Sequence, residues 1–294
     1  MLTIIPDLHA DPNRLQASIK RADHAIAFLG DFIDGSDATG GGSGDATVLK
    51  KVRTLFDKGR AVWVMGNHEL NAILFHRKGE DGQPLRPHSP KNIDQHRSFL
   101  SCFGTETREA IEWTEWFRTT LPLWRDEAGL RLVHAFWSDT LISVIKLRRP
   151  DGLLQLEDLP EIADESTEFG RAVKLLVSGP EVLLPEGYSF ADAKGNKRCE
   201  VRVAWWRGAA SSWGDIALSV PDHSILPQEA FNADLAAMMY PPEAASVLVG
   251  HYKMAGPVQL DHAYAACLDY PATPCVYHFD GENSLLESNL EVLS

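Results

Sequence analysis

Acidic, amide and imidazole side chains recur in five short motifs along this chain, each of a kind that can hold metal ions. The motifs are Asp7-Leu8-His9, Gly30-Asp31-Phe32-Ile33-Asp34, Gly66-Asn67-His68-Glu69, Val133-His134 and Gly250-His251. A mixed set of oxygen and nitrogen ligands suits Mn²⁺, Fe or Zn better than Ca²⁺. Together the motifs predict two-metal chemistry at a phosphoester, in which paired cations clamp the attacking and leaving oxygens.

The spacing of the motifs suggests a role for each side chain. Asp7 and His9 stand at positions i and i+2 of an extended segment, so both side chains point to one side. Asp31 is the natural bridge between two cations, because a carboxylate has two oxygens to share. The other ligands that we expect are Asn67, which offers a carbonyl oxygen, and the imidazoles of His134 and His251.

His68 is the candidate for a residue that acts on the leaving group, because it adjoins the expected ligand Asn67. A histidine that transfers protons is usually oriented by a carboxylate, and Asp34 is the candidate for that partner. The nucleophile would be a hydroxide bridging the two metals, with His68 as general acid.

Each motif follows a run of residues typical of a β-strand. The expected strands are Leu2–Ile5, Ala25–Leu29, Ala61–Met65, Leu130–Val133 and Ser246–Val249. Helical patterns separate the first three strands: one begins at Pro12 behind the N-cap Asp11, and one runs from near Asp45 to Gly59. This alternation predicts an α/β fold with a mainly parallel sheet, in which ligands bind at the carboxyl ends of the strands.

Two regions interrupt this pattern. Residues 78–97 are polar and rich in Pro, Gly and His, and we expect a loop over the mouth of the site. Residues 139–244 form an expected insertion within a single domain of residues 1–294, where they would shape the substrate pocket. In the insertion, Arg202 and Arg207 flank two tryptophans and could bind phosphate through bidentate contacts. The alternative is that Val201–Trp206 is a strand whose tryptophans serve packing.

The composition narrows the class of partner. Over 294 residues the formal net charge is −13, which argues against sequence-independent binding of nucleic acid. A phosphorylated substrate still fits, because two cations would reverse the local sign. No apolar run approaches the roughly 20 residues that span a bilayer, so no membrane association is expected. The N-terminal segment has no basic leader, and the four cysteines form no zinc-like cluster, so we expect a cytoplasmic protein with reduced thiols.

The ordered motifs resemble those of the calcineurin-like metallophosphoesterase superfamily, most of all its bacterial phosphoprotein-phosphatase and symmetrical diadenosine tetraphosphatase-like branch. The resemblance implies a four-layer α/β/β/α sandwich and two divalent ions, with Mn²⁺ expected and Fe, Zn or Mg²⁺ as alternatives. It implies one metal on Asp7, His9 and Asp31, and a second on Asp31, Asn67, His134 and His251. It also implies that His68 is the general acid, paired with Asp34.

Two departures from the family pattern concern how phosphate is held. Relatives often have an arginine directly after the second aspartate of GDxxD, whereas Gly35 and Ser36 follow Asp34 here. Many relatives end in GHxH, whereas Lys253 stands at the place of the last histidine and could neutralise phosphate instead.

We therefore expect a dinuclear-metal phosphoesterase that acts on phosphate esters or anhydrides. Its substrate would be a phosphorylated small molecule, a nucleotide or a phosphoprotein. Hydrolysis of dinucleoside polyphosphates and serine/threonine protein phosphatase activity are the enzyme alternatives. A catalytically weakened, metal-binding regulator is the non-enzyme alternative, which the absent arginine favours and the intact Asn67-His68 pair opposes.

Overall fold

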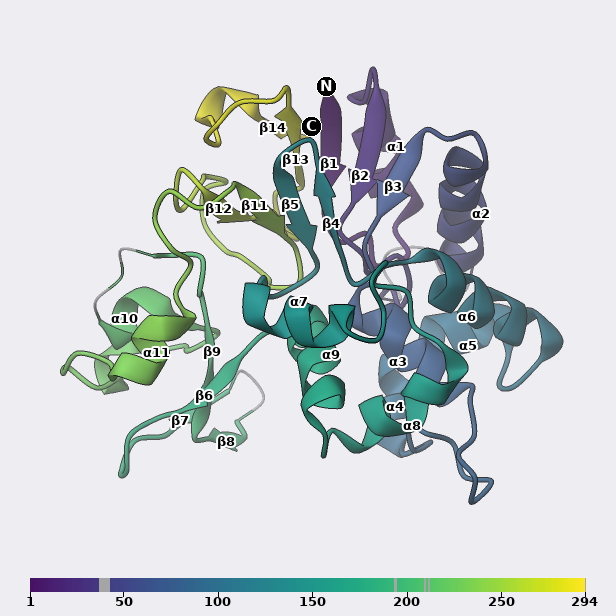
Figure 1. Ribbon diagram of the computed structural model, residues 1–294, viewed down its shortest axis with the longest axis horizontal. Coiled ribbons are helices and arrows are strands. Elements are labelled where there is room, and N and C mark those ends of the chain that lie inside the picture. Colours follow the sequence, from purple (N-terminus) through teal and green to yellow (C-terminus); the bar gives the residue numbers. More distant parts are fainter. Residues whose placement is uncertain (37–42, 193–194, 209, 211, 294) are drawn as a thin grey trace.

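Two β-sheets lie face to face in the computed structural model, which describes residues 1–36, 43–192, 195–208, 210 and 212–293 (Figure 1). The strand orders are β14-β13-β1-β2-β3 in the first sheet and β12-β11-β5-β4 in the second. The first sheet contains β1 (Leu2–Ile5), β2 (Ala25–Phe28), β3 (Ala61–Trp63), β13 (Cys275–Phe279) and β14 (Leu290–Val292). The second contains β4 (Trp124–Glu127), β5 (Leu130–Val133), β11 (Val247–Val249) and β12 (Ala265–Cys267).

Alternation along the strands explains why the sheets pack on each other. Successive side chains of a strand point to opposite faces. Ile4 and Ala27 of the first sheet therefore share one apolar cluster with Leu132 and Leu248 of the second. Phe28, next to Ala27, belongs instead to the cluster that includes the helices.

Helices α1 (Pro12–Lys20) and α2 (Gly44–Asp57) cover the outer face of the first sheet (Figure 1). Helix α1 begins as the sequence predicts, because the Asp11 carboxylate accepts hydrogen bonds from the backbone N–H groups of Asn13 and Arg14. β1, β2 and β3 pair in parallel, which requires such crossover helices. The α/β fold class predicted from the sequence is confirmed.

Two strands are shorter than predicted at the edge where the motifs lie, and a third is shorter at its opposite end. Leu29, Val64 and Met65 leave their strands, although Leu29 N still donates to Ile5 O and Val64 N to Phe28 O. At the amino end of β11, Ser246 precedes the strand. After β2 and β3 the backbone turns away from the ladder because it must present the motif side chains beyond the sheet.

The helices after β3 lie below the sheet edge in Figure 1. They are α3 (Asn67–Phe75), α4 (Pro90–Gln95), α5 (Arg97–Phe103) and α6 (Arg108–Thr120). α3 starts within the third motif, so Asn67 and His68 occupy its first turn. The segment between α3 and α4 folds back along α3, where Arg86 N donates to Leu74 O at 3.0 Å.

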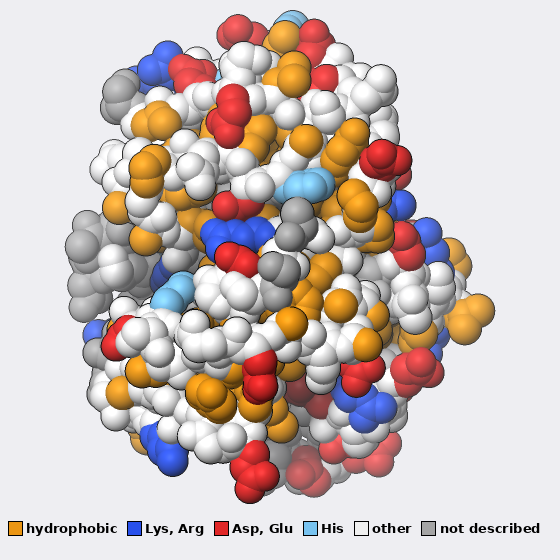
Figure 2. Space-filling model, turned by 90° about the vertical axis from the view of Figure 1, so that its left-hand side faces the viewer, with side chains coloured by type: hydrophobic (Ala, Val, Ile, Leu, Met, Phe, Trp, Pro, Cys, Tyr) orange, Lys and Arg blue, Asp and Glu red, His pale blue; other side chains and the backbone are white. Residues whose placement is uncertain are grey.

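Residues 139–244 contribute helices and two small sheets beside the central pair. The helices are α7 (Asp139–Lys146), α8 (Leu159–Asp164), α9 (Glu168–Ser178), α10 (Trp213–Ile216) and α11 (Ala233–Met238). The sheets are β10-β9-β6, from Ala217–Leu218, Glu200–Val203 and Glu181–Leu183, and the pair β7 (Phe190–Ala191) and β8 (Lys197–Arg198). Short 3₁₀ helices span Leu156–Asp158, His223–Ile225 and Glu287–Asn289. On the face that carries α10 and α11, apolar and charged side chains are interspersed (Figure 2).

This region covers the outer face of the second sheet. Trp205 and Trp206 are fully buried, and Trp205 Nε1 donates to Ala135 O at 2.8 Å. Tyr240 Oη accepts a hydrogen bond from Arg131 Nη1, on the outward side of β5, at 3.0 Å. The two tryptophans follow β9 and serve packing, which favours the second interpretation of this segment.

Candidate metal centre and active site

The loops that follow β1, β2, β3, β5 and β11 meet at the carboxyl ends of their strands. Leu8 N and His9 N both donate to Asp31 O, at 3.0 and 2.9 Å, which joins the first two loops. Gly250 N donates to His134 O at 3.0 Å, which joins the last two. Within each sheet, neighbouring loops therefore hold one another in place.

Several residues of these loops have left-handed backbone conformations, which residues other than glycine seldom adopt. The positive φ angles are 44° at His9, 51° at Asp31, 63° at Asp34 and 66° at His251. Such conformations persist only where surrounding contacts impose them, and they concentrate at functional sites.

Glu69 supplies one of those contacts, a role that sequence reasoning missed although the residue ends the third motif. Its fully buried carboxylate accepts hydrogen bonds from Asp31 N and Phe32 N, both at 2.8 Å, and from Gly66 N at 3.1 Å. Burial and the neighbouring Asp31 raise the pKa of Glu69 to about 7. Glu69 thus ties the second motif to the start of α3.

Ligand atoms of the motif residues gather in three overlapping groups. Within each group these atoms lie within 4.8 Å of one another. The groups are Asp7, His9 and Asp269; His9, Asp31 and His68; and Asp31, His134 and His251. Asp31 belongs to two of them, as expected of a bridging carboxylate.

Asn67 lies between the last two histidine ligands predicted. Its Oδ1 is 3.0 Å from His134 Nε2 and 2.8 Å from His251 Nδ1. His134 Nδ1 lies 2.6 Å from Leu29 O and so donates to that carbonyl, which makes Nε2 the nitrogen that a metal would bind in place of a proton. Asp31 Oδ2 lies 3.4 Å from the same Nε2.

Asp269 is a ligand candidate that sequence reasoning missed, because no motif surrounds it. It is fully buried, and its Oδ2 has no hydrogen-bond partner among the described residues. Burial and the nearby Asp7 raise the pKa of Asp269 to about 7. Its place just beyond β12, which pairs in parallel with β11, was the available signal.

The residues fit a pair of cations. Besides Asp269, His9 Nδ1 and His251 Nε2 are buried without a hydrogen-bond partner in the described part of the chain. Burial would lower the pKa of His134, but Asp31 and Asp7 raise it to about 10. The carboxylates of this site thus attract positive charge to the position where metal ligands converge.

His68 and Asp34 form the predicted pair. His68 Nδ1 lies 2.8 Å from Asp34 Oδ2. Burial would lower the pKa of His68, but Asp31 and Asp34 outweigh it and raise that pKa to about 9. Asp34 Oδ1 lies 2.8 Å from Nδ1 of the buried His96, a partner that the sequence did not indicate.

The chain matches the family described as calcineurin-like phosphoesterase over residues 2–251. It belongs to this family. The resemblance inferred from the motifs is thereby confirmed, and the chain is a metal-dependent phosphoesterase that hydrolyses phosphoric esters. No curated protein sequence is similar enough to count as a relative.

The phosphoesterase also has likenesses among solved structures. A metallophosphoesterase from Sphaerobacter thermophilus is 22% identical, with 46% of each chain covered and a TM-score of 0.30. A mutant cold-active protein tyrosine phosphatase is 15% identical, with 100% of this chain and 80% of that chain covered and a TM-score of 0.45. A protein serine/threonine phosphatase from Saccharomyces cerevisiae is 14% identical, with 99% and 78% covered and a TM-score of 0.43. These likenesses carry no information on substrate.

The three predicted substrate-binding cations of the phosphoesterase lie in different places. Burial is the main cause that lowers the pKa of His9 and of His251. The charge of Lys253 lowers the pKa of His9 further, and the charge of Arg202 lowers that of His251 further. Arg202 also pairs with Glu181 at 3.1 Å. Arg207 is not brought to the site: it pairs with Asp261 at 3.3 Å and lines a separate cavity.

In the described part of the phosphoesterase, no helix combines the length and apolar character that crossing a bilayer requires.

Proposed function

We propose that this phosphoesterase hydrolyses phosphate monoesters with two divalent cations, Mn²⁺ being expected and Fe, Zn or Mg²⁺ the alternatives. Asp7, His9, Asp31 and Asp269 would hold one cation. Asp31, Asn67, His134 and His251 would hold the other. The observation that carries the proposal is the position of Asp31, whose carboxylate belongs to two ligand groups at once. Bound cations supply Lewis acidity and a water of lowered pKa.

His68 would deliver the proton that the leaving oxygen needs. Its Nδ1 lies 2.8 Å from Asp34 Oδ2, and this carboxylate, which is not a proposed metal ligand, favours the imidazolium form. The proton on Nε2 is then the one available for transfer. Asp34 holds the ring in one orientation, while the backbone bond from His68 N to Asp31 Oδ1, at 3.0 Å, anchors the start of α3.

Phosphate monoesters of small molecules or proteins fit better than dinucleoside polyphosphates. A polyphosphate hydrolase would be expected to stack nucleobases on aromatic side chains. Trp205, Trp206 and Tyr252, which adjoin the predicted substrate-binding residues Arg207 and Lys253 in the sequence, are all buried in the core. We also propose a cytoplasmic protein whose residues 139–244 shape the pocket, with Arg202 and Lys253 near its rim.

Hydrolysis of p-nitrophenyl phosphate tests this function. The protein is stripped of metal, reloaded with Mn²⁺ and compared with its His68→Ala variant. We expect metal-dependent turnover that falls by about 10²- to 10⁴-fold in the variant, the usual contribution of a positioned acid. Two tightly bound ions without turnover on any phosphorylated substrate would instead support the regulator alternative.

A further inference from the structure

Arg86 shares a small polar cavity with Asp34, Asn67 and His68. The cavity measures about 50 Å³, several times the space that one water molecule needs. We propose that Arg86 binds the phosphate group of the substrate at this position. This inference rests on the proposed function and adds to it the cation that recognises the anionic group.

The fold brings Arg86 to this cavity from well beyond the third motif. The chain leaves α3 and returns along it, so that Leu85 N donates to Arg77 O at 2.8 Å and Arg86 N to Leu74 O at 3.0 Å. Residues 78–97 therefore reach the site and carry a cation there, although the prediction of a loop is wrong for Pro90–Gln95, which form helix α4.

Neutral side chains orient the guanidinium of Arg86. Its Nη1 donates to Asn71 Oδ1 at 2.6 Å, and its Nη2 donates to Gln95 Oε1 at 2.8 Å. Both acceptors are neutral amide oxygens, and among the described residues no carboxylate forms an ion pair with Arg86, although Asp34 lines the same cavity. Because a guanidinium has five N–H donors in a planar fork, others remain for a phosphate.

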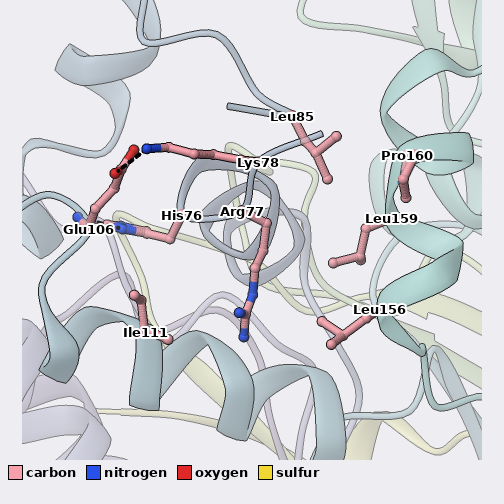
Figure 3. A pocket seen from close by; sticks show the side chains of 9 residues that line it. All are labelled: His76, Arg77, Lys78, Leu85, Glu106, Ile111, Leu156, Leu159 and Pro160. Carbon is pink, nitrogen blue, oxygen red and sulfur yellow. Dashed lines mark hydrogen bonds and ion pairs between the residues drawn. The ribbon is translucent and has the colours of Figure 1, made fainter. Parts of the chain in front are cut away.

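Two nearby cations, Arg77 and Lys78, differ from Arg86 because each pairs with a carboxylate. Arg77 and Lys78 line a neighbouring cavity of about 410 Å³, which Figure 3 shows. Arg77 pairs with Glu115 at 2.6 Å, and Lys78 pairs with Glu106 at 2.8 Å. Carboxylates thus pair directly with these two cations, whereas in the described part of the chain Arg86 has no such direct partner and only shares its cavity with Asp34.

The negative charge of the site explains why a cation would be needed to bind an anionic substrate. Asp7, Asp31 and Asp34 all lie in it, so an anionic substrate meets repulsion wherever bound cations do not offset them. A planar guanidinium with free N–H groups matches two phosphate oxygens at once. The ligand class is therefore a phosphate group, placed where His68 can reach the ester oxygen.

The test measures binding of inorganic phosphate to Mn²⁺-loaded protein by calorimetry, together with kcat and KM for p-nitrophenyl phosphate. Arg86→Met keeps the apolar stem, and Arg86→Lys keeps the charge without the fork. Arg77→Met is the matched control, because Arg77 is an arginine of the same segment in the neighbouring cavity. We expect Arg86→Met to weaken phosphate binding and raise KM by roughly 10- to 100-fold, the usual effect of a charge-assisted hydrogen bond. Arg86→Lys should recover part of the affinity, and Arg77→Met should stay within about twofold of wild type.

Unchanged phosphate affinity in Arg86→Met, with metal content and thermal stability like those of wild type, would overturn the inference. If Arg86→Met does not fold, wild-type affinity in Arg86→Lys together with unchanged KM overturns it equally. Wild-type protein that binds phosphate but has no turnover would contradict the proposed function, and the phosphate affinities would still decide the role of Arg86. Wild-type protein that binds no phosphate would overturn this inference directly.

Discussion

His68 Nδ1 and Asp34 Oδ2 lie 2.8 Å apart, although Asp34 lies in the loop after β2 and His68 in the first turn of α3. Asp34 also contacts His96, and His96 Nε2 lies 3.2 Å from Nε2 of His76. Burial would raise the pKa of Asp34, but His96 and His68 outweigh it and lower that pKa. The Asp34 carboxylate is therefore ionised at neutral pH, and it holds His68 by electrostatic attraction as well as by a hydrogen bond.

His68 should titrate with a raised pKa in the metal-free protein. Its pKa of about 9 lies above the usual 6.5, so the folded state binds this proton more tightly than the unfolded state. The contribution to stability is complete below pH 6.5 and is lost as the pH rises toward 9. NMR of the imidazole should show the raised pKa, and Asp34→Asn should lower it.

Urea unfolding of the metal-free protein provides the second readout of that titration. The stability difference between wild type and His68→Gln should shrink between pH 6.5 and 9. A difference that stays constant over this interval would mean that His68 is not charged in the folded state.

Asp269 should be needed for one of the two cations. Changing a residue that merely supports a metal ligand typically costs about 10- to 100-fold in affinity, so loss of a ligand should cost no less. Asp269→Asn should therefore weaken the binding of one Mn²⁺ by at least about tenfold, as measured by calorimetry and metal analysis. The exposed Asp23→Asn is the matched control. Two ions bound at wild-type affinity would show that Asp269 is not a ligand.

Glu69→Gln should destabilise the protein. In the wild type, three backbone N–H groups donate to the two carboxylate oxygens of Glu69. A glutamine has only one acceptor oxygen, and its NH₂ group would face at least one of these donors. Leaving such buried donors unsatisfied costs about 1–3 kcal/mol in the free energy of unfolding. Denaturant titration of the metal-free protein measures this cost. Equal midpoints for the variant and wild type would show that the loop of Asp31 is held by other contacts.

Gly250→Ala should disturb the first ligand group. A Cβ at this glycine would lie 2.0 Å from Asp7 Oδ1, and His251 N donates to the same carboxylate oxygen at 3.0 Å. Because Asp7 is buried and held, we expect weaker Mn²⁺ binding and a stability loss of about 1–3 kcal/mol. Gly214→Ala is the control, since the nearest atom to its Cβ is the Ser212 hydroxyl oxygen at 3.7 Å. A variant that binds Mn²⁺ like wild type would show that Asp7 can move without loss.

Much of the site could be predicted because its signals are local. Hydrophobic alternation marks a strand, and a polar motif directly after it must lie at the carboxyl end of that strand. Asp7, Asp31 and Asn67 could therefore be placed at one edge of a sheet from the residues around them. The cap at Asp11 and the parallel order of the first strands follow from equally short patterns.

Only the tertiary structure decided which distant side chains complete the site. Asp269, His96 and Arg86 carry no motif, and they reach the site because two sheets stack and a segment folds back along α3. The same folding buries Trp205 and brings Arg207 to Asp261, although the sequence allowed Arg207 a place at the substrate. Local sequence determines the direction of a side chain on its own element, whereas contacts between elements depend on how whole faces pack, which no short pattern specifies.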